Sequence, residues 1–205
     1  MSQPAKPSRK ELSHDRILDA ASRAIRRHGF DGVSVADVMK EAGLTHGGFY
    51  AHFGTREDMV AEAIEYGARQ SAESLDRGVA ARCRRGATPF RALVESYLSE
   101  PHIEAKEGGC VVAALGSEMS RQTPKVHEAS AARITGLVRR IEATLAPEVP
   151  KERAMAIAGT MVGALQMARA LGGRQGKDML AASREALLEQ YDKADSSATP
   201  DKNVE

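Results

Sequence analysis

Residues 45–52 read Thr-His-Gly-Gly-Phe-Tyr-Ala-His and contain no acidic side chain. If this segment is a short helix, Leu44 and Phe49 face inward. The outward set is then Thr45, His46, Gly47, Gly48, Tyr50 and His52. Short or hydrogen-bonding residues of this kind suit a surface that faces phosphates and base edges. Two consecutive glycines cost about 1 kcal/mol each relative to alanine in a helix, so a close approach of the backbone to a ligand is the better explanation for them.

The elements that must position this set lie within residues 34–53. Ser34, with Asp37 three residues later, resembles a capping box that opens a short helix, and Gly43 ends that helix. Thr45 then opens a second short helix. Two short helices joined by a glycine-containing turn are typical of the helix-turn-helix motif, whose second helix enters the major groove of DNA.

We expect a longer amphipathic helix on each side of this segment. The first begins at an N-cap, Ser13, and ends at Gly29, and its apolar residues recur at helical spacing. Thr55, with Asp58 three residues later, opens the second. That helix gives way to a loop at residues 78–86, which are rich in arginine and bounded by glycines.

Four runs carry a more specific pattern: Ile-Leu-Asp-Ala-Ala (17–21), Gly-Phe-Asp-Gly-Val-Ser-Val (29–35), Ala-Gly-Leu-Thr-His-Gly-Gly-Phe-Tyr-Ala-His-Phe (42–53) and Thr-Arg-Glu-Asp-Met (55–59). Together they resemble the DNA-binding domain of the tetracycline-repressor-like (TetR/AcrR) family. The resemblance covers about residues 13–60, and the later expected helices match the family in number, length and order only. It implies a homodimeric transcription regulator, usually a repressor, in which the first three helices bind an operator half-site.

The resemblance also implies roles for single residues. Ser34 and Val35 are expected to contact a phosphate. The base edges are expected to be contacted by Thr45, His46, Gly47 and Gly48. The DNA backbone is expected to be bound by Tyr50, His52 and Arg56. The segment departs from the family where many members have side chains larger than Gly47 and Gly48. It also has no Arg, Asn or Gln for bidentate base readout. Specificity then rests on His46, apolar contacts, Lys40 and the basic residues 6–10.

The whole chain is predicted to be all-α, with about nine helices and four parts. Residues 1–12 form a flexible basic arm, 13–54 the DNA-binding domain, 55–191 an effector-binding and dimerisation domain, and 192–205 a disordered tail. The five later helices are expected at 89–98, 110–119, 124–145, 154–171 and 179–191. Residues 154–171 are apolar nearly all round and rich in small residues, which predicts burial against neighbours or against a second copy of the chain.

Candidates for an effector site lie in this second part. Cys110 follows two glycines at the expected start of a helix, with Lys106 nearby, and such surroundings lower the pKa of a thiol. The Gly-Gly-Cys start also resembles TetR members that sense electrophiles or oxidants, although a free cysteine is most often a small buried hydrophobe. Phe90, Tyr97 and Met119 are candidates to line an apolar effector pocket, or else belong to the core.

The remaining observations exclude other classes. Residues 1–56 hold nine basic against six acidic side chains, whereas 57–205 hold 20 against 22, so the N-terminal quarter is mildly basic. The six histidines show no metal-ligand spacing, and neither a nucleophile elbow nor a phosphate loop is present, so we expect no metal, no cofactor and no enzyme. Two cysteines, no apolar leader and no long apolar run favour the cytoplasm and no membrane partner.

The sequence therefore predicts a homodimeric repressor that binds a palindromic double-stranded operator and is released by a small molecule or by thiol modification. Two alternatives stay open. One is an architectural or division-type DNA-bound protein of the same fold that needs no effector, and the other is a helical interaction module. Salt-dependent, sequence-selective retention of DNA separates the module from the other two.

Overall fold

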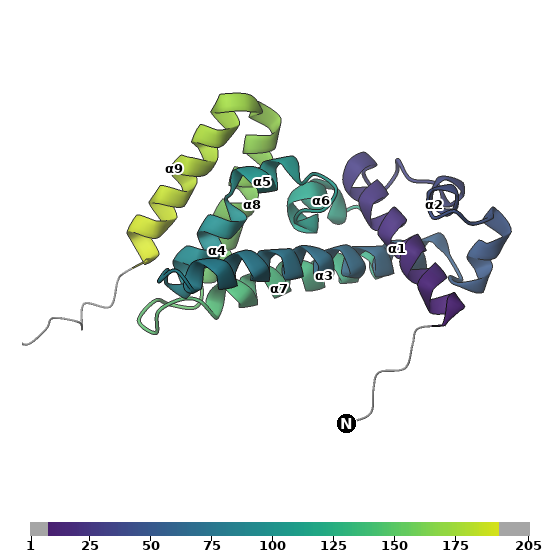
Figure 1. Ribbon diagram of the computed structural model, residues 1–205, viewed down its shortest axis with the longest axis horizontal. Coiled ribbons are helices and arrows are strands. Elements are labelled where there is room, and N and C mark those ends of the chain that lie inside the picture. Colours follow the sequence, from purple (N-terminus) through teal and green to yellow (C-terminus); the bar gives the residue numbers. More distant parts are fainter. Residues whose placement is uncertain (1–7, 193–205) are drawn as a thin grey trace, which may run out of the picture. The chain divides into compact units, whose positions relative to one another are not determined.

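The computed structural model describes residues 8–192, and every regular element in that range is a helix (Figure 1). The elements are α1 (Arg9–His28), α2 (Val35–Glu41), the 3-10 helix η1 (His46–Ala51), α3 (Arg56–Cys83), α4 (Pro89–Tyr97), α5 (Glu100–Glu104), α6 (Val111–Met119), α7 (Pro124–Glu142), α8 (Arg153–Leu171) and α9 (Gly173–Tyr191). The predicted all-α class is confirmed. The short helix α5 is an element that the sequence analysis missed.

The described residues form two compact units, each made of two stretches of chain. The first unit comprises 8–74 and 104–136, and the second comprises 75–103 and 137–192. The first therefore holds α1, α2, η1, α6 and most of α3 and α7, whereas α4, most of α5, α8 and α9 belong to the second. The functional division at residue 54 stays a prediction.

The start of α1 corrects the prediction that Ser13 is its N-cap. The N-cap lies five residues earlier, at Ser8, which forms a capping box with Glu11: the Ser8 N–H donates to Glu11 Oε2 at 2.6 Å, and the Glu11 N–H donates to Ser8 Oγ at 3.2 Å. Ser13 lies inside the helix, and its hydroxyl donates to the Arg9 carbonyl. Residues 9–12 of the expected arm are thus helical, and residues 1–7 lie outside the described range.

Two later boundaries also differ from the prediction. Helix α3 continues to Cys83, through most of the expected loop 78–86, because no proline interrupts it before Pro89. At the other end of the chain, Asp192 is ordered: its carboxylate, with a side chain only 5% exposed, pairs with Arg91 Nη2 at 2.7 Å. The remainder of the predicted tail, 193–205, lies outside the described residues.

The core of the first unit explains how the helix-turn-helix segment is held. Large apolar side chains from α1, the two short helices and α3 are almost fully buried together. They include Ile17, Ile25, Phe30, Val38, Met39, Phe49, Met59 and Ile64. Burying a side chain of this size contributes about 1.5–3 kcal/mol, so the short elements α2 and η1 owe their stability to this core rather than to their own length.

In the second unit, α8 packs along α9 (Figure 1). The buried residues of α8, among them Ile157, Met161 and Leu165, form one stripe of the helix. The helix is long and apolar enough to span a membrane by length and composition alone, but 39% of that window is buried in the fold. Its other face leaves Met155 and Met167 at least half exposed. The predicted all-round burial of α8 is therefore absent within the single chain.

Candidate nucleic-acid interface

The first short helix begins where the sequence predicted. Ser34 is the N-cap of α2: its Oγ accepts the Asp37 N–H at 3.1 Å, and its hydroxyl donates to the Asp37 carboxylate at 2.6 Å. Val35, the first residue of the helix, is half-buried, whereas Ser34 is exposed. Both proposed phosphate contacts therefore lie at the amino end of a capped helix.

The turn between the short helices depends on Gly43. Its φ of +70° lies in the left-handed region that favours glycine, and the next residue, Leu44, donates its N–H to the Met39 carbonyl at 2.8 Å. Ala42 is buried beside this turn. The turn directs the chain into η1 with Phe49 pointing into the core, as predicted for an inward residue.

The second short helix corrects the expectation of a helix over 46–53. It is a 3-10 helix that ends at Ala51, and Thr45, its N-cap, makes no side-chain capping bond. The Gly48 N–H donates to the Thr45 carbonyl at 3.0 Å, in the i to i+3 pattern. Two glycines weaken the preference for an α-helix here, so the tighter turn set by the buried Phe49 prevails.

Packing within the fold does not require glycine at position 47 or at position 48. A Cβ added at Gly47 would meet nothing within 4 Å, and one added at Gly48 would meet Met39 Cε at 3.6 Å, an ordinary contact. Thr45, His46 and Gly47 are exposed, and Tyr50 is 72% exposed while its ring edge rests on Phe49. The absence of side chains at 47 and 48 thus opens the backbone to an outside molecule.

His52 belongs to a small aromatic cluster rather than to the exposed set. Its ring centroid lies 5.6 Å from that of His14 in α1, and the His14 ring stacks on Phe53 at 4.7 Å. The Nε2 atom of His14 is 2.9 Å from Glu62 Oε2 in α3. Burial, with His14 and Lys10 nearby, lowers the pKa of His52 below its usual value.

Arg56 is half-buried, and its guanidinium bonds to the loop between α1 and α2. The Nε atom donates to the Val33 carbonyl at 3.2 Å, and Nη2 donates to the carbonyls of Phe30 and Val33. These donors hold the loop that leads into Ser34 against the start of α3. The phosphate contact of Arg56 stays a prediction, since the structure gives its donors these other acceptors.

The start of α3 is fixed by a reciprocal cap and by an ion pair. The Thr55 N–H donates to Asp58 Oδ2 at 2.9 Å, and the Asp58 N–H donates to Thr55 Oγ1 at 3.1 Å. The same carboxylate pairs with Lys125 of α7. This pair lowers the pKa of Asp58. The predicted Thr55–Asp58 cap is confirmed, whereas its partner Lys125 carried no sequence signal.

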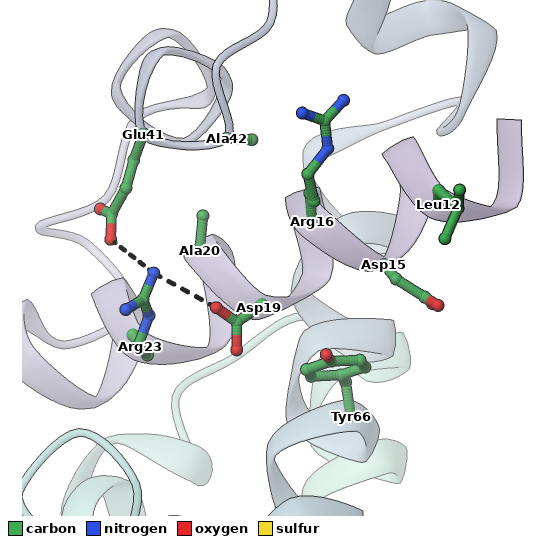
Figure 2. Close-up of a pocket in the computed structure, with 9 residues that line it drawn as sticks. All are labelled: Leu12, Asp15, Arg16, Asp19, Ala20, Arg23, Glu41, Ala42 and Tyr66. Carbon is green, nitrogen blue, oxygen red and sulfur yellow. Dashed lines mark ion pairs between the residues drawn. The ribbon is translucent and has the colours of Figure 1, made fainter. Parts of the chain in front are cut away.

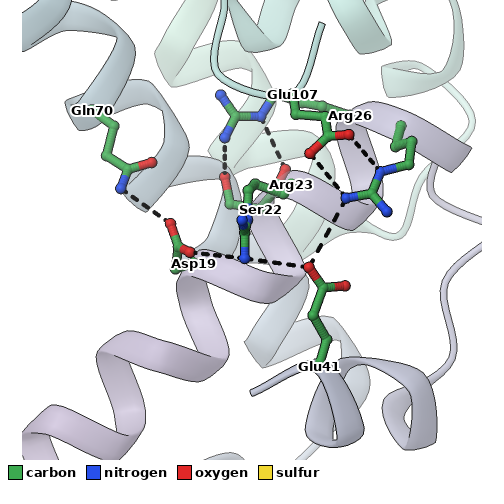
Figure 3. A network of polar contacts seen from close by, with 8 residues as sticks. Asp19, Ser22, Arg23, Arg26, Glu41, Gln70 and Glu107 are labelled. Carbon is green, nitrogen blue, oxygen red and sulfur yellow. Dashed lines mark hydrogen bonds and ion pairs between the residues drawn. The ribbon is translucent and has the colours of Figure 1, made fainter. Parts of the chain in front are cut away.

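A buried arginine, Arg26, joins α1 to the turn before α6, and Figure 3 shows its bonds to Ser22 within α1. The Arg26 side chain donates to Gly109 O at 3.0 Å and to Ser22 O and Oγ at 2.9 Å each. Burial lowers the pKa of Arg26 to about 10, against the opposing effects of Asp19, Cys110 and Glu107. Sequence analysis missed this contact, although Ser22 and Arg26 sit one turn apart beside the apolar stripe of α1.

The far end of α6 contacts α1 as well. Glu118 Oε2 accepts the Phe30 N–H at 2.9 Å. The carboxylate occupies the space beside Gly29, where an added Cβ would lie 2.7 Å from Oε2. Gly29 also has a φ of +77°. Helix α6 is therefore attached to the carboxyl end of α1 at both of its own ends.

The four candidates for an effector site do not gather in one unit. Cys110 is the partly exposed N-cap of α6, and Met119, at its other end, is buried in the first unit. Phe90 and Tyr97 are buried in α4 of the second unit. Within each unit these three apolar side chains contribute to a core, and their role in a pocket stays a prediction.

Figure 2 shows a hollow of the first unit, with a volume of about 360 Å³. Its lining combines both signs of charge, and Arg23 there pairs with Asp19 at 3.2 Å and with Glu41 at 3.3 Å. None of the four effector candidates lines this hollow. In the described range, no three His, Cys, Asp or Glu side chains are grouped so that they could hold a metal ion.

Comparison with known proteins agrees with this geometry. Residues 17–63 match the family model described as bacterial regulatory proteins, tetR family. The uncharacterised HTH-type transcriptional regulator YfiR of Bacillus subtilis (strain 168) is 30% identical over 100 residues, which make up 49% of this chain and 46% of that protein. The aligned part thus spans about half the length of this curated relative.

Solved structures share the fold over nearly the whole chain. A TetR transcriptional regulator from Chloroflexus aurantiacus J-10-fl has a TM-score of 0.72 and 23% identity, and the match covers 89% of this chain and 97% of that one. The reduced form of Escherichia coli NemR has a TM-score of 0.70 and 16% identity, with 87% and 96% covered. At these identities the likeness establishes the fold.

The fold, the helix-turn-helix site and the matched N-terminal segment together define a protein of the kind found in transcriptional regulators. The matched N-terminal segment and the curated relatives support a more specific class: residues 17–63 are similar to the DNA-binding segment of bacterial regulatory proteins of the tetR family.

Proposed function

We propose that the protein is a homodimeric repressor that binds an operator in double-stranded DNA. One observation carries this proposal: residues 45–50 present an exposed, acid-free surface on a helix anchored by the buried Phe49. The surface lies within the segment that matches the family model. Because the fold leaves the space at Gly47 open, the backbone of η1 can approach base edges closely.

In this proposal the DNA contacts follow the order of the chain. The amino end of α2 places Ser34 and Val35 at a phosphate, where a helix N-terminus favours an anion. Residues 45–48 face the base edges in the major groove. Tyr50 and His52 bind the backbone on the other side of η1, and Arg56 contributes by holding the loop that carries Ser34.

Selection of duplexes from a random pool by the full-length protein tests the DNA-binding function. We expect recovery of a two-fold symmetric sequence whose half-sites are about one helical turn, 34–36 Å, apart. Binding should weaken steeply with salt because phosphate contacts release counterions. A pool that stays random after several rounds would contradict the proposal and favour the interaction module.

The dimer is proposed to form through α8 and α9. The exposed face of α8 carries Met155, Met167 and Leu171, each about half exposed or more. Gly159 and Gly163 lie in the same helix, and a Cβ at either would meet nothing within 4 Å. Small residues between exposed apolar ones allow a second copy to pack closely and to remove that apolar surface from water.

Gly163→Arg should convert the dimer to a folded monomer. The side chain has room in the single chain but places a charge in the proposed interface, where an unpaired buried charge is strongly unfavourable. Sedimentation velocity at micromolar concentration measures the change, and circular dichroism checks the fold. Gly136→Arg in α7, also in open space, is the matched control and should stay dimeric. A monomeric wild-type protein would contradict the proposed dimer.

Release from DNA is proposed to act through the attachment of α6 to α1. The partly exposed Cys110 caps α6 next to Gly109, whose carbonyl accepts from the buried Arg26. A group added to this thiol would disturb the contact that fixes α6 to α1. A solved structure that shares this fold, that of Escherichia coli NemR, is described as a reduced form. A non-covalent ligand bound beside Phe90 and Tyr97 of α4 is the second candidate for the trigger that releases the protein from DNA. We also propose that the protein acts in the cytoplasm.

A further inference from the structure

The pair of histidines beside the proposed DNA surface has a geometry that the DNA-binding function does not by itself require. His14 comes from α1 and His52 follows η1, yet their ring centroids are only 5.6 Å apart. The ring of Phe53 stacks on His14 at 4.7 Å and helps to hold it in place. Two imidazoles at this distance repel each other if both carry a charge.

The groups around His14 and His52 differ in whether they favour a positive charge on the ring. Glu62 of α3 lies 2.9 Å from His14 Nε2 and can balance a charge on that ring. On the His52 side, burial and the nearby His14 and Lys10 all disfavour the imidazolium and lower the pKa of His52. The other charged groups near Glu62 are Lys125 of α7, which interacts with it electrostatically, and Asp58, which pairs with Lys125.

The Nδ1 atom of His52 gives a second, geometric reason for a neutral ring. This nitrogen is buried and has no hydrogen-bond partner in the part of the chain that the structure describes. A neutral imidazole with its proton on Nε2 leaves only a lone pair there, whereas an imidazolium would leave a buried N–H without an acceptor. The contacts of the free protein thus disfavour the imidazolium of His52, next to the surface proposed to meet DNA phosphates.

We propose that DNA binding by this protein is coupled to proton uptake at His52. The inference rests on the proposed function, which places a backbone phosphate next to this ring. A phosphate at hydrogen-bond distance favours the imidazolium, because opposite charges stabilise the charged form. The proton that His52 lacks in the free protein is taken up as the complex forms, and hydrogen ions become a co-ligand for DNA.

The direction of the effect follows from linkage. Since the pKa of His52 is higher in the complex than in the free protein, affinity for DNA rises as pH falls through the pKa of the complex. It levels off below the pKa of the free protein. A difference of one pKa unit corresponds to an affinity gain of up to about tenfold. Above the pKa of the complex, affinity does not depend on this group.

His14 sets where this rise occurs. Because its ring opposes a charge on His52, removing it should move the rise toward higher pH. His14→Gln keeps an amide that can still bond to Glu62, and it removes the imidazole ring next to His52. A purely structural role of His14 would change affinity at every pH without moving the midpoint.

Fluorescence anisotropy with the full-length protein and a short mixed-sequence duplex tests the proposal, because phosphate contacts do not require the operator sequence. Between about pH 8 and about pH 6 the wild-type affinity should rise several-fold. His52→Gln should lose most of that rise. The matched control is His127→Gln, which removes an exposed histidine of α7 in the same unit and should behave as the wild type.

Proton NMR titration of the His52 ring, free and bound to the duplex, provides a readout besides affinity. Its midpoint should lie at higher pH in the complex, and His14→Gln should raise the midpoint of the free protein. The same pH dependence in wild type and His52→Gln, or equal midpoints free and bound, overturns the inference while DNA binding itself stands. If the wild type binds no duplex at low salt, the proposed function fails as well.

Discussion

Gly47→Glu is expected to weaken DNA binding strongly while leaving the fold intact. The change puts a carboxylate on a surface that has no acid, at a position where the Cβ meets nothing within 4 Å. Like charges brought together in a protein–DNA contact cost several kcal/mol, so affinity should fall by about 100-fold or more. Anisotropy with the selected operator measures the loss, and urea unfolding should show stability within about 0.5 kcal/mol of wild type.

Two controls separate charge from shape at this position. Gly47→Ala adds only a methyl group and should weaken binding far less than Gly47→Glu does. Gly136→Glu places the same charge at an open glycine of α7 and should leave DNA affinity unchanged. If Gly47→Glu binds the operator as well as the wild type does, η1 is not the element that meets DNA.

A maleimide is expected to release the protein from its operator through Cys110. The thiolate adds to the carbon–carbon double bond of N-ethylmaleimide, and the neighbouring carbon takes up a proton. The new group lies next to Gly109, whose carbonyl binds Arg26, and so disturbs one of the two attachments of α6. A coupling free energy of about 1–3 kcal/mol would lower operator affinity by about 5–150-fold.

The two cysteines of the chain provide the matched controls for this experiment. Cys83→Ser removes the exposed thiol at the end of α3 and should leave the response to maleimide intact. Cys110→Ser should remain on the operator after treatment. Equal release of wild type and Cys110→Ser would rule out the thiol route and leave a non-covalent ligand. If nothing releases either protein, the architectural alternative gains support.

The sequence correctly predicted helix caps and a turn that depend on residues close together in the chain. The caps at Ser34 and Thr55 each depend on a side chain three residues away, and Gly43 marks a backbone conformation that few other residues adopt. The start of α1 was placed wrongly because Ser8 and Ser13 both precede plausible turns. The capping box of Ser8 with Glu11 decides in favour of the earlier one.

Contacts between distant residues were out of reach of sequence reasoning. Arg56 looks like a free cation beside the motif, yet it bonds to carbonyls 23 and 26 residues away. Arg26 and Gly109 are separated by 83 residues, and the rings of His14 and His52 lie close together although they come from separate elements. A linear pattern shows which faces are apolar. It does not show which polar groups meet once those faces pack.

Because the first unit is built from two separate stretches of chain, the N-terminal segment that holds the helix-turn-helix cannot be moved to another protein by itself. Residues 8–74 pack with 104–136, which return to supply the acceptor at Gly109 and the carboxylate of Glu118. An N-terminal segment transplanted alone into another regulator would leave Arg26 buried without its Gly109 acceptor, a costly defect. A chimera that exchanges operator specificity therefore has to carry both stretches, or else change only the exposed residues of η1.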